Sequence, residues 1–285
     1  MTTRRAFTRR ANRRGFTLVE LLVALVLTAV LGGAAMRLFL TQSRFFDLHV
    51  KQQSARAVSR SAVNGVLSDL RMVEAPNAVT AASTSSITIR VPYAFGVVCA
   101  TNATFTTVAF MPVDSLTLAN AALSGYAYRG ASGAYTLTEG SVTTATGATG
   151  TCTGASITPI TGGKILNVSP PMAAAATAGT PVYLYQRVRY AFAASTAYPG
   201  RTGLWRTLME TGATEEIAAP FNSTSGFEFF DLNAGGASST TVPTLTNIRG
   251  IELVFNGESE KPRFGRTSPE ATSYRTAVFF MNGNR

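Results

Sequence analysis

The sequence contains one stretch that constrains the whole chain: the 21 residues from Phe16 to Met36 carry a single charged side chain, Glu20. As an α-helix this stretch would be about 31 Å long, which matches the hydrocarbon core of a bilayer. Six arginines and no acidic residue precede it. Because positive flanks stay on the cytoplasmic side, the pattern predicts a single-pass anchor whose C-terminal side is exported.

Glu20 is the anomaly in this apolar stretch. A carboxylate inside the bilayer costs about 2.5–3.5 kcal/mol on insertion scales, so an ionisable residue at this depth indicates a function. Cleavage after Gly15 would remove the arginines and leave an ammonium group on Phe16. An ion pair between that ammonium and Glu20 of a neighbouring copy would neutralise two charges that are costly in hydrocarbon. Burial of the pair would then be coupled to polymerisation.

The run Arg13-Arg14-Gly15-Phe16-Thr17-Leu18-Val19-Glu20 resembles the class III leader of type IV prepilins and pseudopilins. The resemblance implies that a prepilin peptidase cleaves between Gly15 and Phe16, that Phe16 is N-methylated, and that Glu20 guides assembly. Two other interpretations stay open: an ordinary signal anchor with a chance glutamate, and a twin-arginine signal at Thr3 to Phe7. The apolar run exceeds the roughly 7–15 residues of a cleavable signal core, which disfavours the twin-arginine signal.

The composition beyond the apolar stretch indicates an exported, β-rich protein. The 285 residues have a formal charge of +10, but without the six leader arginines 19 basic and 15 acidic residues remain. The remaining excess is not clustered, which gives no firm indication of a nucleic-acid partner. Roughly 210 residues follow the long helix that we predict below, and they suffice for one hydrophobic core.

Two cysteines, Cys99 and Cys152, are present. An even number of cysteines in an oxidising, exported compartment favours a disulfide between them. Closing a loop of about 54 residues would stabilise the fold by about 4 kcal/mol in the chain-entropy model. Two unpaired buried thiols are the alternative.

Helical periodicity continues past the apolar stretch. The segment from Arg37 to Val73 has no proline, and apolar residues recur mostly at steps of three or four from Phe45 onward. Pro76 is expected to end the helix. We therefore predict one helix of about 58 residues, apolar all round in its first half and amphipathic in its second. The amphipathic half needs a globular partner, and Gly32-Gly33 is a weak point in the helix.

From Ile87 onward the pattern changes to that of strands. β-Branched and aromatic residues alternate in seven segments; these are residues 87–91, 105–110, 182–192, 203–208, 226–232, 248–255 and 274–281. Within the third segment, Tyr183 and Tyr185 fall on the face opposite Val182, Leu184 and Val188. The stretch Gly140 to Gly163, rich in Ser, Thr, Gly and Ala, is predicted as a long loop, and Met172 to Thr180 as a second.

The predicted fold is α+β, a long helix packed against a β-rich globular head as in pilins. The expected domains are a cleaved leader (1–15), a helix (16–75, with 16–36 transmembrane) and a head (76–285).

The head contains, in this order, the segments Val188-Arg189-Tyr190, Leu204-Trp205-Arg206, Glu215-Glu216-Ile217-Ala218, Phe227-Glu228-Phe229 and Ile248-Arg249-Gly250-Ile251. This order resembles that of PilW-like minor pilins, and J-type pseudopilins of type II secretion share much of it. The region Ser115 to Pro171 and the Gly-Gly pair depart from the pattern.

The resemblance implies a structural subunit of a pilus priming or tip complex. The expected partners are other minor pilins, the major pilin, the prepilin peptidase and an inner-membrane assembly platform. The expected location is the inner membrane, with an exported head, and then a pilus or pseudopilus. A tip-displayed adhesin, with binding loops between Ser115 and Pro171, is an alternative role.

The sequence offers little for catalysis. Its one histidine, His49, has no second histidine or nearby cysteine with which to hold zinc. It contains no phosphate loop and no Gly-rich dinucleotide turn after a strand. Glu215-Glu216, or Glu228 with Asp231, could form the carboxylate pair of a glycosidase, but acids on exported strands are more often solvated. We therefore expect no enzyme, no metal and no cofactor, and we expect Trp205 to be a packing residue.

Overall fold

The structure is a computed structural model that describes residues 17–73, 77–118, 121, 123–130, 133, 135–144, 152, 162–173 and 176–280. The chain divides into two compact units, one up to Val50 and one from Lys51 onward. We call the second unit the head. The first helix contributes residues to both units.

Helix α1 extends from Leu18 to Met72, and by length and composition it could cross a membrane. Between Leu18 and Leu40 its large apolar side chains are exposed around the whole circumference. Such a surface is unfavourable in water and requires lipid or other apolar helices around it. From Ala55 onward one face is buried in the head; its buried residues are Ala55, Ser59, Ala62, Val63, Val66 and Leu70.

Thirteen strands in the described residues form one antiparallel sheet system. The elements after α1 are β1 Val79–Ala82, β2 Ser86–Thr101, β3 Thr106–Phe110, α2 Pro112–Thr117, β4 Gly125–Arg129, β5 Tyr135–Glu139, β6 Ser141–Thr144, β7 Lys164–Ser169, β8 Pro181–Ala194, β9 Thr202–Leu208, β10 Thr214–Phe221, β11 Gly226–Asp231, a 3₁₀ turn Leu245–Asn247, β12 Ile248–Glu258 and β13 Ala271–Phe279. The main order is β11-β12-β10-β9-β8-β2-β3-β7-β6, with β1 beside β2, β13 beside β12, and the β4–β5 pair beside β8.

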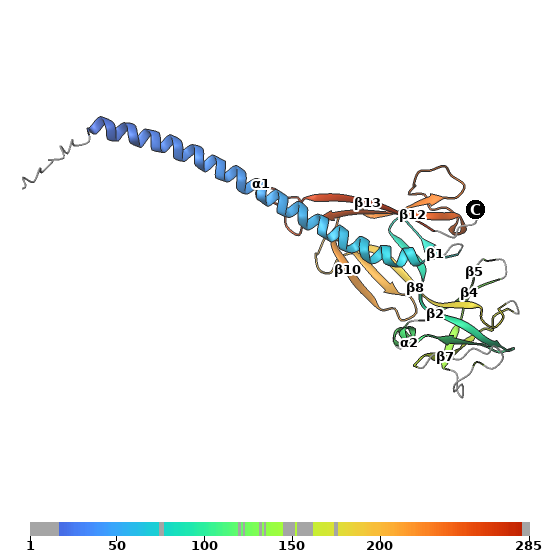
Figure 1. Ribbon diagram of the computed structural model, residues 1–285. Helices are drawn as coiled ribbons and strands as arrows, with labels where there is room; N and C mark the ends of the chain where they lie inside the picture. Colours follow the sequence, from blue (N-terminus) through green and yellow to red (C-terminus); the bar gives the residue numbers. More distant parts are fainter. Residues whose placement is uncertain are drawn as a thin grey trace, which may run out of the picture. The chain divides into compact units, whose positions relative to one another are not determined.

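The first of two large cores lies between α1 and the strands β8 to β12 with the first half of β2 (Figure 1). Val66 and Leu70 of α1 share this core with Ile89, Phe221 and Phe255, all of which are almost completely buried. The apolar residues that recur every 3.6 positions on one face of the helix thus pack against the apolar residues that alternate along the strands. We call this part of the head the first lobe.

Helix α1 and the sheet approach each other closely at Gly257 of β12. A Cβ atom added there would lie 2.3 Å from the carbonyl oxygen of Ala55 and 2.5 Å from Oγ of Ser59. The absence of a side chain at Gly257 therefore lets the strand touch the helix backbone.

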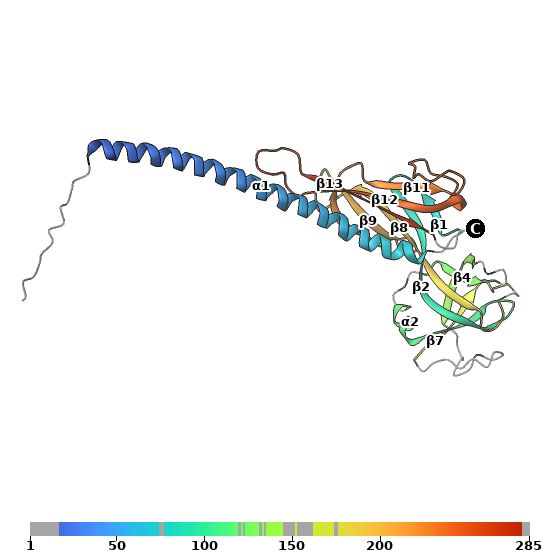
Figure 2. The same cartoon turned by 45° about the horizontal axis from the view of Figure 1, so that its top comes forward.

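The second large core is built on the other halves of β2 and β8, in residues 94–185, which we call the second lobe (Figure 2). Ala94 and Val98 of β2 pack there with Leu184 of β8, Phe110 and Tyr126. Along β8 the neighbouring strand changes from β4, at residues 182–185, to β9, at residues 188–194. Both lobes therefore depend on the same two long strands.

The predicted α+β fold is confirmed: a long apolar helix packs against a large antiparallel head. The seven predicted strands correspond to β2, β3, β8, β9, β11, β12 and β13. The helix ends at Met72, and Pro76 lies outside the described residues.

The sequence patterns missed β1, β4 to β7, β10 and the short α2. Strand β4 has no alternation because four of its five residues are buried. The predicted loop from Gly140 to Gly163 is wrong at its start, where β6 pairs with β7; most of the remainder lies outside the described residues.

We predict that Gly257→Ala lowers the free energy of unfolding by about 1–3 kcal/mol, the usual cost of overpacking. The new methyl group must displace the backbone of α1 at Ala55. Urea unfolding of the full chain in detergent, followed by the fluorescence of Trp205, measures the change. Gly235→Ala is the matched control because no atom lies within 4 Å of the added Cβ. Equal stability of the two variants would contradict the prediction.

Candidate functional site

The first turn of α1 holds Glu20 by a reciprocal set of hydrogen bonds. The backbone N–H of Thr17 donates to Oε2 of Glu20 over 3.0 Å, and the N–H of Glu20 donates to Oγ1 of Thr17 over 3.3 Å. The hydroxyl of Thr17 also donates to Oε2 of Glu20 over 3.0 Å. This is a capping box, which satisfies two N–H groups that a helix start otherwise leaves unpaired.

The capping box turns the carboxylate of Glu20 toward the N-terminal end of the helix. Negative charge is favourable there because the unpaired N–H groups give the helix start a partial positive charge. Gly15 and Phe16, the predicted cleavage and methylation residues, lie outside the described residues. Thr17 is the residue that the sequence reasoning missed, although its spacing from Glu20 is that of a capping box.

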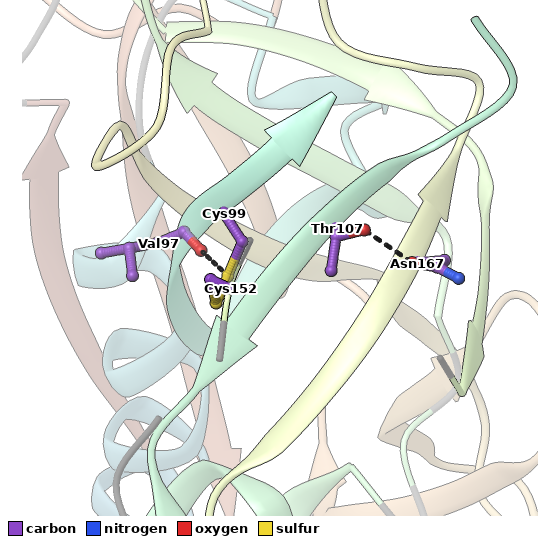
Figure 3. The surroundings of a disulfide bond; sticks show 5 residues. All are labelled: Val97, Cys99, Thr107, Cys152 and Asn167. Carbon is purple, nitrogen blue, oxygen red and sulfur yellow. Dashed lines mark hydrogen bonds between the residues drawn. A yellow bond between two sulfur atoms is a disulfide. The ribbon is translucent and has the colours of Figure 1, made fainter. Parts of the chain in front are cut away.

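The two cysteines are joined in a disulfide, Cys99–Cys152, with a Cα–Cα distance of 4.9 Å (Figure 3). Both are buried in a small cluster with Ala109 on the face of β2 and β3 that lies opposite the second core. Beside the disulfide, the hydroxyl of Thr107 donates to Oδ1 of Asn167 over 3.0 Å, across β3 and β7. The disulfide therefore ties Cys152 to strand β2.

Helix α1 is also linked to the first lobe by a polar contact. The hydroxyl of Tyr190 on β8 donates to Oδ2 of Asp69 over 2.5 Å, and Nε of Arg206 lies 3.8 Å from the same oxygen. Burial, followed by the charge of Asp69, raises the pKa of Tyr190, so the phenol stays protonated as the donor. Arg206 also contacts Glu215 at 3.4 Å. Glu215 is therefore part of an ion-pair network.

The acidic residues considered for glycosidase chemistry are engaged in other contacts. Glu228 lies directly opposite Glu252 on β12, and Asp231 instead accepts a hydrogen bond from the backbone N–H of Asn233. Arg275 of β13 contacts Glu228 at 2.7 Å and Glu252 at 3.0 Å. The hydroxyl of Ser238 contacts both carboxylates. One arginine thus bridges two facing acids and reduces the repulsion between them.

Glu216 is held separately, by a loop beside β9. Its Oε2 accepts hydrogen bonds from the hydroxyl of Thr196 over 2.7 Å and from the N–H groups of Thr196 and Ala197. Burial tends to raise the pKa of Glu216, but these hydrogen bonds and one from Ser195 lower it overall. This carboxylate secures a turn.

His49 and Trp205, the other two residues considered as candidate site residues, make packing and backbone contacts. His49 packs edge-on against Phe45, one helical turn earlier, with ring centroids 4.2 Å apart. Trp205 is half-buried, and its Nε1–H donates to the carbonyl of Ala194 over 3.2 Å. Among the residues that the structure describes, no group of three His, Cys, Asp or Glu side chains could hold a metal ion.

A comparison with protein families matches residues 10–36 to the model described as the prokaryotic N-terminal methylation motif. No curated protein and no solved structure matches the chain significantly. The matched segment contains the Gly15–Phe16 bond, Thr17, Glu20 and the apolar start of α1. The chain therefore carries the N-terminal motif of type IV pilin-like proteins, and with it the class III signal that fits membrane anchoring.

We predict that Arg275→Gln weakens the head in a pH-dependent way. The hydrogen bond from Arg275 is the main reason that the pKa of Glu252 is lowered; burial opposes it, and Ser238 adds to it. A lowered folded-state pKa gives stability that is present above the unfolded value, near 4.5, and is lost as pH falls through the folded pKa. The variant should therefore be less stable than the wild type at neutral pH, and the gap should narrow in acid.

Urea unfolding from neutral pH down to about pH 3 measures this gap, because that range crosses the ordinary carboxyl pKa. Arg129→Gln is the control, since Arg129 donates to the backbone carbonyl of Gly133. A gap of the same size throughout the range would show that Arg275 does not act through a carboxylate.

Proposed function

We propose that this protein is a PilW-like minor pilin, a structural subunit of the priming or tip complex of a type IV pilus. The observation that carries the proposal is the N-terminal methylation motif at residues 10–36, which includes the apolar first part of α1, whose only acid is Glu20. The long helix and the antiparallel head give the expected pilin-like fold. The resemblance of the head segments favours the PilW-like group.

The proposed processing begins with cleavage between Gly15 and Phe16 by a prepilin peptidase, followed by N-methylation of Phe16. In the stored subunit, Thr17 keeps the carboxylate of Glu20 hydrogen-bonded. On assembly, the ammonium of a neighbour's Phe16 becomes a stronger partner because opposite charges attract strongly in a low-dielectric surrounding. The apolar surface of residues 16–36 then packs against other helices in the filament.

The proposed location follows from the same motif. The subunit waits in the inner membrane with its head exported, and an assembly platform moves it into a filament with other minor pilins and the major pilin. The domains that we propose remain the leader (1–15), the helix (16–75) and the head (76–285). A J-type pseudopilin of a type II secretion system would use the same steps, and a neighbourhood of secretion genes would favour it.

A tip-displayed binding role is a second candidate. It is favoured by the second lobe, which has its own hydrophobic core and carries the disulfide. Shortening the region between Ser115 and Pro171 separates the roles. Normal piliation with lost attachment would favour a binding module, whereas lost piliation would favour a purely structural subunit.

We expect mass spectrometry of the purified mature chain to find an N-terminus at methylated Phe16. The reason is that the peptidase recognises the leader and removes the arginines at the edge of the apolar stretch. A strain without the prepilin peptidase is the control, and its chain should keep residues 1–15. A mature chain that still begins with its arginines, or that lacks the whole apolar segment, would refute the proposal.

We predict that Glu20→Ala leaves cleavage at Gly15 intact but lowers incorporation into filaments roughly tenfold or more, because the neighbour's ammonium loses its partner in the apolar core. Glu20→Gln separates the two roles of this residue. Glutamine can complete a capping box but cannot neutralise an ammonium. Filaments isolated from cells and probed with an antibody to the head measure incorporation. Wild-type incorporation of Glu20→Gln would show that capping, not charge, is what assembly requires.

A further inference from the structure

The loop between β12 and β13 emerges where α1 enters the head. This hairpin loop comprises residues 259–270. Two residues before it, Gly257 is in contact with Ala55 and Ser59, which begin the buried face of α1. Figures 1 and 2 both show the β12–β13 hairpin ending beside this part of the helix. The loop therefore lies at the end of the head that is joined covalently to the apolar segment.

The tip of the hairpin loop combines an exposed aromatic ring with positive charge. Residues Lys261 to Arg266 read Lys-Pro-Arg-Phe-Gly-Arg and contain three cations and no acid. Phe264 is 81% exposed, more than any other large hydrophobic residue of the described chain, the apolar segment of α1 included. Gly265 has a φ of +77°, which suits the turn that presents the ring.

The acidic residues at the base of the hairpin loop each have a partner there. Glu258 contacts Arg201 at 3.4 Å, and Glu270 contacts Arg263 at 3.1 Å. Glu260 accepts a hydrogen bond from the hydroxyl of Tyr198 and so raises the pKa of that tyrosine. Within the described residues no acidic side chain forms an ion pair with Lys261 or Arg266. Glu260 keeps its negative charge, but the three cations of residues 259–270 still exceed the two acids, so the loop as a whole is positive.

Helix α1 adds further cations at the same end of the head. Arg56 and Arg60 are exposed, and each directly follows a residue that touches Gly257, namely Ala55 and Ser59. Clusters of lysine and arginine beside a membrane-spanning helix attract anionic lipid headgroups. An aromatic ring flanked by cations suits the boundary between headgroups and acyl chains, because the ring enters the apolar layer and the cations stay at the phosphates.

We propose that the tip of the hairpin loop binds the anionic surface of the membrane in which α1 is anchored. Phe264 enters the interface, while Lys261 and Arg266, assisted by Arg56 and Arg60, contact lipid phosphates. The apolar segment up to Leu40 is only fifteen residues from Ala55 along the chain, so the loop is tethered to the bilayer at a high effective concentration. The contact holds the stored head in one orientation and must break when the subunit leaves the membrane.

The inference rests on membrane anchoring under the proposed function, but not on filament assembly. The test uses the full chain with Phe264→Trp, reconstituted into vesicles that contain lipids with brominated acyl chains. One set of vesicles is phosphatidylcholine alone, and the other also contains phosphatidylglycerol. Bromine quenches only a tryptophan that enters the acyl layer. The wild type, with Trp205 alone, gives the background, and Phe95→Trp, on the exposed part of β2 in the second lobe, is the matched control.

We expect about a twofold or greater quenching of Phe264→Trp in the vesicles with phosphatidylglycerol, little in phosphatidylcholine alone, and reversal by high salt. Adding Lys261→Gln and Arg266→Gln should abolish most of the quenching. Flotation with the vesicles checks insertion, and far-UV circular dichroism checks folding. Insertion without quenching, quenching independent of lipid charge, or quenching that survives the two glutamine substitutions would each overturn the proposal. Failure of the chain to float with the vesicles would instead overturn the membrane anchoring itself.

Discussion

The structure depends on the packing of one helix that must satisfy two different surroundings. Up to Leu40 the helix is apolar around its whole circumference, and from Ala55 onward only one stripe is buried. The sheet covers the stripe, so the second part of the helix completes the core of the first lobe. None of the residues that the structure describes covers the apolar part, which requires lipid or neighbouring helices. Folding of the head and anchoring of the chain are thus functions of the same element.

The N-terminal end of this helix also has two possible sets of interactions, one within the chain and one with a neighbouring subunit. In the single chain, the carboxylate of Glu20 accepts hydrogen bonds from both the backbone and the hydroxyl of Thr17. Under the proposed function, an ion pair between Glu20 and the ammonium of a neighbour's Phe16 would therefore replace hydrogen bonds from Thr17. The carboxylate is not without a partner before assembly. The drive toward assembly under the proposed function is the difference between these two sets of interactions, which is smaller than the full cost of an unpaired carboxylate in hydrocarbon. A small difference is compatible with subunits that must also be stored.

The local sequence predicted the features that depend on local periodicity or spacing. The buried stripe of α1 and the strands with alternating residues are of this kind. Tyr183 and Tyr185 were placed correctly on the face opposite the core of β8, but they are buried because Ala127 of β4 and Leu137 of β5 cover them. Two further pairs also join residues that are far apart in the chain. Glu228 is the cross-strand partner of Glu252, and Tyr190 is hydrogen-bonded to Asp69. Period and spacing contain no information about such pairings, because these are set by strand order.

Under the proposed function, the two lobes explain why the segments that suggest a PilW-like minor pilin are confined to one part of the head. The head segments that resemble the family lie on β8 to β12, and these strands surround the buried face of α1. The region that departs from the pattern, Ser115 to Pro171, falls in the second lobe, which has its own core and its own disulfide. In the part of the chain that the structure describes, the buried face of α1 lies in the core of the first lobe, so the residues of that lobe must fit the helix. The second lobe continues β2 and β8 but has a core of its own, so its surface can differ without disturbing the packing of α1.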